Sequence, residues 1–137
     1  MTKVFLDTNI LVYAVDQRDS AKHLRAVDAV DACLREGTGV ISTQVLQEFA
    51  SVAVTKLHQR IEVVLAELLV LERLEVVHLT PTLIRRALEL HALHDVHYWD
   101  AAILAAAEVA NCSRLWSEDF APGSIYGLLR VENPLAE

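Results

Sequence analysis

The feature that most constrains this chain is a run of three apolar residues near its start that ends on a carboxylate. Val4-Phe5-Leu6 shows no alternation of apolar and polar side chains, and Asp7-Thr8-Asn9 follows it directly. An uninterrupted apolar run predicts a strand covered on both faces, as in the centre of a parallel sheet. Asp7 would then lie at the carboxyl edge of that sheet, where open α/β folds bind ligands. A helix cap is the alternative role for Asp7, since Asp, Thr and Asn all favour cap positions.

The composition predicts one domain over residues 1–137. The chain has 137 residues, 53% of them hydrophobic, and a formal net charge of −7. That charge argues against a protein that coats nucleic acid non-specifically, although a metal site that gathers acids is compatible with it. Cys33 and Cys112 are isolated, which favours a reducing compartment. The sequence shows no signal peptide and no apolar run of membrane-spanning length, so we expect a cytoplasmic protein with no membrane partner.

Strands and helices are predicted to alternate along the chain. The predicted strands cover residues 4–6, 40–41, 75–79 and 112–116, with a further short one over 128–131. The predicted helices cover residues 10–15, 20–36, 58–73 and 81–94, with one more starting after the Ser42-Thr43 cap and one at Trp99. Alternation of this kind implies right-handed crossovers and a parallel sheet. The sequence therefore predicts an α/β fold.

Four helices carry specific expectations about burial. In the helix over 20–36 the apolar residues recur at spacings of three and four, and Ser20 is expected to cap it; the predicted inward residues are Leu24, Val27, Val30 and Leu34. In the helix over 58–73 the predicted inward residues are Ile61, Val64, Leu65, Leu68, Leu69 and Leu71. The helix from Trp99 is apolar nearly all round, which predicts burial between the sheet and another layer. Glu48 falls at the border of the apolar arc of its helix and is expected to be half buried.

Four acidic residues are predicted to converge at one edge of the sheet. Asp7 and Asp119 follow strands, Asp100 begins a helix, and Glu48 lies little more than one turn into another. Strand ends and helix starts share one edge of a parallel α/β sheet. Clustered carboxylates need a compensating cation because like charges raise one another's pKa. Oxygen ligands without thiolates favour Mg²⁺ or Mn²⁺. Taken singly, Asp7 and Asp100 can be explained as helix caps, and Glu48 can be explained as a solvent-facing side chain.

Three histidines at intervals of three residues also suggest a metal. His91 and His94 share a helical face, but His97 lies beyond the helix and the chain has no H-E-x-x-H pattern. Structural or surface roles are therefore favoured over a zinc site.

The segments that carry the acids resemble a known family. Leu6-Asp7-Thr8-Asn9, the helical Glu48, the run from Tyr98 to Ala107 and the segment from Leu115 to Phe120 resemble the motifs of a PIN domain, and more narrowly those of VapC-type toxins of bacterial toxin-antitoxin pairs. The resemblance spans essentially the whole chain. It implies a Mg²⁺-dependent endoribonuclease with a three-layer α/β/α fold around a central parallel sheet of four or five strands. It also implies a homodimer held inactive by a cognate antitoxin.

The resemblance assigns roles to individual residues. The family's catalytic and metal-binding acids fall on Asp7, Glu48, Asp100 and Asp119. The supporting positions are Thr8, Asn9 and Ser117. Glu118 adjoins Asp119 and is the alternative fourth acid. In the implied reaction a bound Mg²⁺ or Mn²⁺ activates water against an RNA phosphodiester, and no side chain acts as nucleophile.

Two other functions compete with the ribonuclease. A haloacid-dehalogenase-like phosphatase also begins with an Asp after a strand, but it needs a second acid two residues later, where this chain has Asn9. A catalytically silent PIN scaffold that binds only a protein partner is the second, and the net charge of −7 keeps it open. RNA contacts would come from cations at the rim, for which the candidates are Arg18, Lys22, Arg25 and Lys56.

Overall fold

The computed structural model describes residues 2–137, and this part of the chain forms six strands and six helices. The strands are β1 (Val4–Leu6), β2 (Gly39–Ser42), β3 (Glu75–Val77), β4 (Arg114–Trp116), β5 (Ile125–Tyr126) and β6 (Leu129–Glu132). The helices are α1 (Thr8–Tyr13), α2 (Ser20–Glu36), α3 (Thr43–Thr55), α4 (Ile61–Leu71), α5 (Pro81–His94) and α6 (Tyr98–Val109).

The strands form one sheet in the order β3-β2-β1-β4-β6-β5, parallel except for β5. The predicted α/β fold with a central parallel sheet is confirmed. The prediction of four or five strands missed β5, which has only two residues and pairs antiparallel with β6. Two residues are too short to give an alternation pattern. Gly127, with φ 62°, makes the tight turn between these strands.

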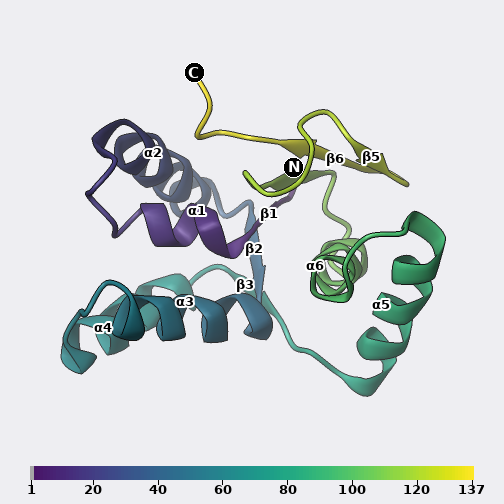
Figure 1. Cartoon of the computed structure of the whole chain (residues 1–137), viewed down its shortest axis with the longest axis horizontal. Coiled ribbons are helices and arrows are strands. Elements are labelled where there is room, and N and C mark those ends of the chain that lie inside the picture. Colours follow the sequence, from purple (N-terminus) through teal and green to yellow (C-terminus); the bar gives the residue numbers. More distant parts are fainter. Residues whose placement is uncertain (1) are drawn as a thin grey trace.

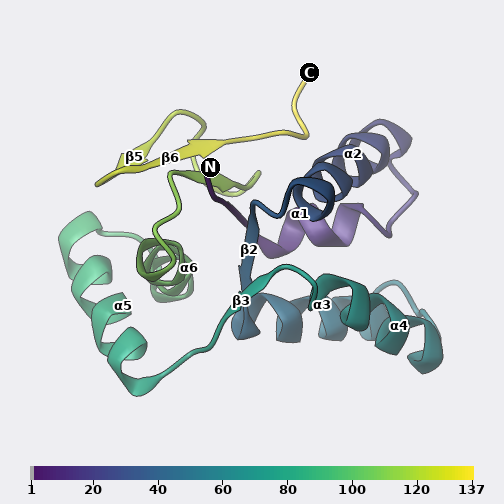
Figure 2. The ribbon, with the colours of Figure 1, turned by 180° about the vertical axis from the view of Figure 1, so that it is seen from behind.

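Helices cover both faces of the sheet. Figures 1 and 2 show α1 to α4 on one side of the strands and α5 with α6 on the other. Every residue from Ala101 to Ala107 is buried, which confirms the expectation for this helix, and its alanines allow close packing on both sides. Within residues 2–137, no helix combines the length and the apolarity needed to cross a membrane.

The inward face of α2 differs from the predicted one. Its buried residues are Ala26, Ala29, Val30 and Cys33, whereas Leu24 and Val27 are 63% and 38% exposed. The helix lies so close to β2 that a Cβ on Gly39 would come within 2.8 Å of the Cβ of Cys33. Small side chains therefore face the sheet, although the hydrophobic pattern favours the larger ones.

The start of α2 depends on a different residue from the one expected. Asp19, rather than Ser20, caps the start by accepting a hydrogen bond from the Lys22 N–H. Gly37 ends the helix in the left-handed conformation with φ 68°. Gly39 lies in β2, where the close approach of α2 excludes a side chain.

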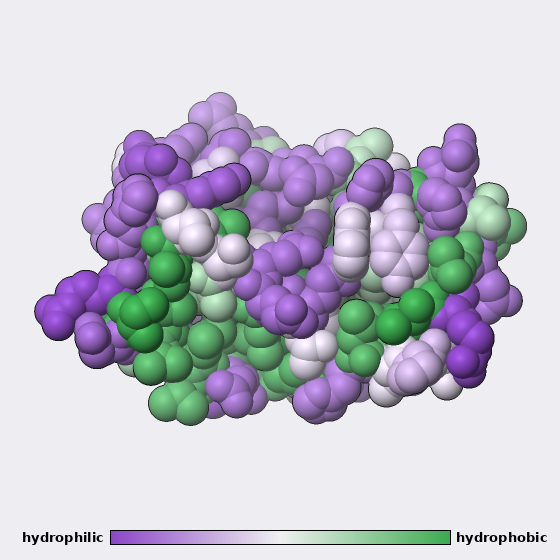
Figure 3. All heavy atoms as spheres, turned by 60° about the horizontal axis from the view of Figure 1, so that its bottom comes forward, coloured by the Kyte–Doolittle hydropathy of each residue, from purple (hydrophilic) through white to green (hydrophobic). Residues whose placement is uncertain are grey.

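Helix α4 is shorter and more exposed than predicted. It begins at Ile61 and ends at Leu71, and of its residues only Val64 and Leu71 are buried. Ile61, Leu65 and Leu69 are 55%, 57% and 69% exposed. The helix packs on α3 at the outside of its layer, so the sheet does not cover it. Figure 3 shows apolar side chains gathered on the α3–α4 side of the molecule and again over α5.

The sheet topology places a switch point between β1 and β4. From β1 the chain continues to β2 and β3 on one side, then returns to β4 on the other side of β1. Leu6 pairs with Trp116 in the parallel register, so Asp7 and Ser117 leave the sheet side by side. The carboxyl ends of such neighbouring strands are where open α/β sheets bind their ligands.

Candidate functional site

Asp7 is a buried carboxylate at this switch point. Its backbone N–H donates to the Trp116 carbonyl at 3.0 Å, which fixes it to the end of β4. One carboxylate oxygen accepts the Thr8 N–H at 2.8 Å, and the other accepts the Ser117 hydroxyl at 2.8 Å. Asp7 is therefore both the cap of α1 and a member of the predicted acidic site, and the two interpretations do not exclude each other.

The environment of Asp7 disfavours its charge. Asp7 is only 7% exposed, and burial raises its pKa from 3.8 to about 6. The hydrogen bonds from Ser117 and Thr8 lower the pKa, whereas the negative charges of Asp119 and Glu48 raise it further. The two hydrogen-bond donors therefore lower the pKa of Asp7 by less than burial and the neighbouring acids raise it.

Glu48 reaches the site from α3 and is held by two side chains. The Thr8 hydroxyl donates to one of its oxygens at 2.7 Å, and the Gln44 amide donates to the other at 3.1 Å. The expected half burial is wrong, because Glu48 is exposed. It lies in the second turn of α3, and its carboxylate is oriented by hydrogen bonds rather than by packing.

Asp119 is tied to the same group through Asn9 and Ser117. The Asn9 amide donates to Asp119 at 3.0 Å and lies 3.3 Å from the Ser117 hydroxyl oxygen. That oxygen also accepts the Asp119 N–H at 3.0 Å. Because the Ser117 hydroxyl donates to Asp7, a continuous set of hydrogen bonds joins Asp7 to Asp119. All three predicted supporting residues, Thr8, Asn9 and Ser117, thus contact predicted acids.

Asp100 lies in the first turn of α6 and completes the set. It is partly buried, and burial raises its pKa. A nearby His97 lowers that pKa, while the charges of Asp119 and Glu48 raise it. The same two acids therefore act on Asp7 and on Asp100. The structure brings all four predicted acids into one electrostatic neighbourhood; that they are catalytic metal ligands stays a prediction.

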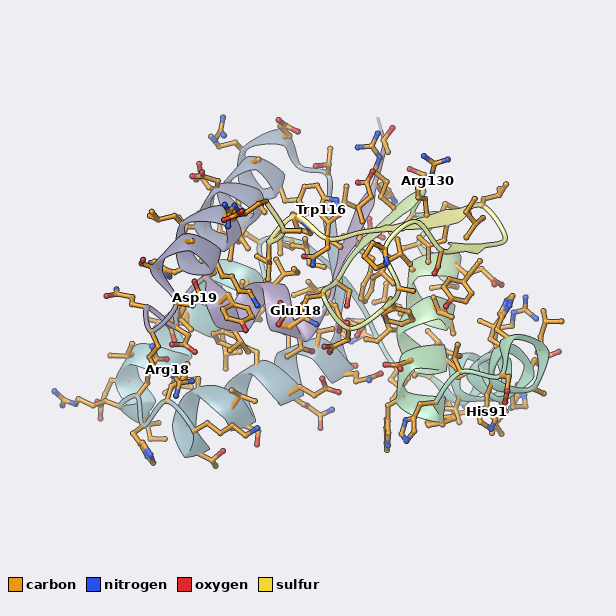
Figure 4. All side chains as sticks on the ribbon, turned by 45° about the horizontal axis from the view of Figure 1, so that its top comes forward. Arg18, Asp19, His91, Trp116, Glu118 and Arg130 are labelled. Atoms are coloured by element: carbon orange, nitrogen blue, oxygen red, sulfur yellow. The ribbon has the colours of Figure 1, made fainter. Side chains whose placement is uncertain are left out.

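Glu118 turns away from this group. Its carboxylate pairs with Lys22 Nζ at 2.9 Å, and that ammonium also lies 5.1 Å from the centre of the Tyr13 ring. The Glu118 N–H donates to the Asn9 side-chain oxygen at 3.2 Å. Figure 4 shows Glu118 over α1, with Arg18 at the far end of that helix. The geometry favours Asp119 over Glu118 as the fourth acid.

The other residues singled out in the sequence take separate positions. His91 contacts the Val96 carbonyl, the His94 ring packs edge-on against Tyr126, and His97 caps α6 through its Nδ1.

Among the rim cations, Arg18 pairs with Asp16, Arg25 donates to the Leu135 carbonyl, and Lys22 pairs with Glu118. Lys56 lines a pocket of about 400 Å³ together with Arg18.

Gln44 is a site residue that the sequence reading missed. It is 7% exposed, and its amide nitrogen donates to Glu48 at 3.1 Å and to the Trp99 carbonyl at 3.3 Å. The available signal was its position four residues before Glu48, which places the two side chains on one helical face. Gln44 thereby joins α3 to the start of α6.

The donor set suits a hydrated divalent cation. The acids offer only carboxylate oxygens, a chemistry that Mg²⁺ and Mn²⁺ favour. Within residues 2–137, no three Asp, Glu, His or Cys side chains lie close enough together to chelate an ion as arranged. Mg²⁺ commonly retains several waters and takes one or two carboxylates directly, so a hydrated ion fits.

An apolar cavity of about 450 Å³ between α5, α6 and β6 is lined by none of these acids.

Comparisons with known proteins place this geometry in a family. The PIN domain family model matches residues 4–123. A chain from a Klebsiella pneumoniae toxin-antitoxin complex is 25% identical with a TM-score of 0.70, and the match covers 96% of this chain and 98% of that one. VapC20 of Mycobacterium tuberculosis, described as a sarcin-ricin loop cleaving toxin, is 18% identical with a TM-score of 0.66, over 84% and 88% of the two chains.

A third similar structure is the DNA-bound VapBC complex of Salmonella typhimurium, 18% identical with a TM-score of 0.69 over 98% and 99% of the chains. A search of curated proteins gave no significant match. The family match covers the three segments that supply Asp7, Glu48 and Asp100 as well as the loop with Asp119. The chain therefore belongs to the PIN domain family, and it shares its fold with VapC toxins.

Proposed function

We propose that this protein is a metal-dependent endoribonuclease that hydrolyses RNA phosphodiester bonds, with Asp7, Glu48, Asp100 and Asp119 as its catalytic acids. One observation carries the proposal: a buried carboxylate of raised pKa, Asp7, is joined by hydrogen bonds to the residues that hold Glu48 and Asp119. Acids arranged in this way without a cation repel one another. Membership in the PIN family and the cleaving activity named for VapC20 support an RNA substrate.

The supporting residues would orient the acids before any substrate binds. Ser117 holds one oxygen of Asp7 and leaves the carboxylate facing the switch point. Thr8 and Gln44 each hold one oxygen of Glu48, and Asn9 positions Asp119. Such partners of metal ligands fix ligand orientation and raise metal affinity.

Mg²⁺ or Mn²⁺ bound by these acids would neutralise charge on the scissile phosphate and acidify the attacking water. The chain itself supplies fixed negative oxygens for the ion and polar donors that keep them in place. No Ser, Cys or His nucleophile is required. Asn9 stands where a phosphatase of the haloacid-dehalogenase kind needs an acid, and its amide is already used to hold Asp119.

The direct test is cleavage of RNA by the purified protein. We expect cleavage with Mg²⁺ or Mn²⁺, none after EDTA, and recovery when the metal is returned. Asp100→Asn should remove the activity while leaving the fold, and Asp28→Asn, an exposed acid on α2, serves as the charge-matched control. Full activity in EDTA, or full activity of Asp100→Asn, would contradict the proposal.

We further propose that the protein is the toxin of a toxin-antitoxin pair and forms a homodimer. Two of the solved structures it resembles are VapBC complexes, and another is a toxin-antitoxin complex. Exposed apolar side chains suit burial by protein partners; on α4 and α5 they include Ile61, Leu65, Leu69, Leu88 and Leu93.

Expression in bacteria separates this proposal from a silent scaffold. We expect growth arrest when the protein is induced alone, relief when the antitoxin is co-expressed, and no arrest by Asp7→Asn. Arrest that Asp7→Asn leaves unchanged would instead indicate a protein that acts by binding. Sedimentation of the purified chain tests the homodimer, and a concentration-independent monomer would contradict it.

A further inference from the structure

The cavity of about 450 Å³ between α5, α6 and the β5–β6 hairpin lies at the edge of the sheet opposite to the acids (Figure 1). Its lining includes Asn111, Cys112 and Ser113, which connect the end of α6 to the start of β4. Asp100 lies in the first turn of α6, and roughly 12 Å of helix separates it from Glu108, which lines the cavity. Small-molecule sites in proteins have volumes of about 300–1,000 Å³. The cavity therefore has the size of a ligand site that is separate from the acids.

The walls of the cavity are mainly apolar and come from all three surrounding elements. Leu90 belongs to α5, Leu104 to α6 and Leu129 to β6. The His94 ring of α5 packs edge-on against Tyr126 of β5, with centroids 5.1 Å apart, and so joins the helix to the hairpin. Packing between the elements thus shapes the walls before any ligand binds, which lowers the entropy cost of binding.

Ser113 contributes a polar group that has no use within the protein. Its hydroxyl oxygen is buried and has no hydrogen-bond partner among residues 2–137. The backbone of Ser113 is fixed, because its N–H donates to the Lys3 carbonyl at 3.1 Å and its carbonyl accepts the Arg130 N–H at 3.0 Å. A buried hydroxyl without a partner costs free energy, and a hydrogen-bonding ligand would recover that cost. No hydrogen bond holds the hydroxyl in one rotamer, so it can turn to a polar atom in the cavity and either donate to it or accept from it.

The charges at the cavity are already balanced. Arg86 and Glu108 both line it, and Arg86 donates to the two carboxylate oxygens of Glu108 at 2.9 and 3.1 Å. Cys112 is buried, and burial raises the pKa of its thiol to about 12, so the thiol stays neutral. An ion that enters an apolar site without a partner pays a large desolvation cost. A charged ligand would have to break the Arg86–Glu108 pair, whereas a neutral one would not.

Two exposed leucines stand at the opening of the cavity. Leu128, in the turn of the hairpin, is 94% exposed, and Leu93 of α5 is 70% exposed. Both also line the cavity. An apolar molecule inside would cover part of each side chain and remove that surface from water.

We propose that this cavity binds a small, uncharged, mainly apolar molecule that carries one hydroxyl, carbonyl or N–H group, and that this group bonds to Ser113. The inference goes beyond the proposed ribonuclease and does not depend on it, since none of the four acids lines the cavity. A second copy of the chain is the competing occupant, because it too would cover Leu93 and Leu128.

Two dyes that differ by one charged group test the inference. N-phenylnaphthylamine is neutral and apolar and has one N–H, and anilinonaphthalenesulfonate adds a sulfonate to the same skeleton. We expect the neutral dye to bind at one saturable site per chain with enhanced emission, and the sulfonate to bind at least about tenfold more weakly. Equal affinity for the two dyes, or no saturable binding of the neutral one, would overturn the inference.

Substitutions of exposed leucines locate the dye without disturbing the core. Leu93→Glu and Leu128→Glu should each weaken binding of the neutral dye by about tenfold, because they place a charge at the opening of the cavity. Leu65→Glu and Leu69→Glu are the matched controls, since these leucines of α4 are 57% and 69% exposed. Binding that the α4 variants lose and the cavity variants keep would place the dye elsewhere and contradict the inference.

Ser113→Ala tests the hydrogen bond by two measurements. The variant should bind the neutral dye about two- to tenfold more weakly. Without dye its Tm should rise, because the substitution removes a buried hydroxyl that has no partner. Ser51→Ala, at an exposed position of α3, should change neither quantity. Unchanged affinity of Ser113→Ala would overturn the proposed hydrogen bond.

Dye binding and RNA cleavage separate this inference from the proposed function. The neutral dye should bind equally well in Mg²⁺ and in EDTA. Cleavage without dye binding would overturn the inference and leave the ribonuclease intact, and dye binding without cleavage would count against the ribonuclease alone. Sedimentation tests the competing occupant: a wild-type dimer that excludes the dye and that Leu128→Glu dissociates would show that a second copy covers the cavity, which would also overturn the inference.

Discussion

Two aspartates of nearly equal exposure flank α1, and they differ in what surrounds them. Asp7, before the helix, is 7% exposed, and Asp16, after it, is 8% exposed. The pKa of Asp7 is raised to about 6, chiefly by burial. The pKa of Asp16 is lowered, chiefly by hydrogen bonds from Arg18. The charged form of aspartate is thus disfavoured at Asp7, before α1, and favoured at Asp16, after it.

The difference comes from the partner that each carboxylate has. Arg18 donates to both oxygens of Asp16, at 3.0 and 2.8 Å, and covers it from the solvent side. Asp7 receives neutral donors from Ser117 and Thr8, and its charged neighbours are acids. At Asp16 the pairing cation is a residue of the chain itself, Arg18. Within residues 2–137, no Lys or Arg side chain forms an ion pair with Asp7. The proposed function accounts for this difference by a cation bound from solution.

The largest expected effect is on cleavage. Under the proposed function, Asp7→Asn should lower kcat/KM for RNA by at least about 100-fold, because losing a carboxylate proposed to bind the metal would remove several kcal/mol of transition-state stabilisation. Asp16→Asn is the matched control at the other end of α1 and should retain cleavage within a few-fold. If both variants lose activity equally, or if neither does, the distinction between the two aspartates is wrong.

Asp7→Asn and Asp16→Asn should change the free energy of unfolding in opposite directions. The folded pKa of Asp7, about 6, lies above its ordinary value of 3.8, so its protonated form favours the folded state. The metal-free protein therefore loses stability as the pH rises from about 4 to about 6. At pH 7, Asp7→Asn should raise the free energy of unfolding by about 2 kcal/mol.

Asp16 behaves in the opposite way because its folded pKa is lowered. Its contribution is present above the ordinary pKa of 3.8 and is lost as the pH falls below it. Asp16→Asn should therefore destabilise the protein at pH 7. Urea titrations of both variants in EDTA, at pH 4 and pH 7, measure these signs, and a destabilised Asp7→Asn at pH 7 would contradict the account of Asp7.

A third prediction concerns the hydroxyl between Asp7 and Glu48. Thr8→Val keeps the shape of the side chain but removes the 2.7 Å hydrogen bond to Glu48. With Glu48 as a metal ligand, as proposed, we expect about tenfold weaker activation by Mg²⁺, because loss of a residue that orients a metal ligand typically costs that much. Mg²⁺ titration of cleavage measures it, with Thr55→Val, an exposed site on α3, as the control. An unchanged Mg²⁺ requirement would show that Gln44 alone positions Glu48.

The sequence predicted the parts of this molecule that local chemistry determines. The apolar run before Asp7, the helix start at residue 81 and the buried alanine helix each have a signal within a few residues, and each is confirmed. The convergence of the four acids follows from topology, because parallel strands and their helices share an edge. Their assignment as metal ligands stays a prediction.

The failures concern packing between distant segments. The exposed Leu24 and Val27 of α2 depend on how closely that helix approaches Gly39, and periodicity does not encode this distance. The apolar residues of α4 have the spacing of a buried face, but Ile61, Leu65 and Leu69 are exposed because the helix lies at the outside of its layer. Glu48 is held by Thr8, which is 40 residues away in the chain, so its exposure could not be read from the pattern of its own helix.

The smallest expected effect concerns Lys22, which forms an ion pair with Glu118 as Arg18 does with Asp16. Lys22→Met leaves Glu118 without its cation, but the Glu118 N–H still donates to Asn9, and Asn9 still holds Asp119. The ion pair is partly exposed, so we expect kcat/KM to fall by only about two- to fivefold. Lys22→Arg should restore it, since a guanidinium can pair with the same carboxylate. A loss as complete as that of Asp7→Asn would mean that Lys22 serves the reaction directly. Glu118 would then belong with Asp7, among the acids of the site, rather than with Asp16.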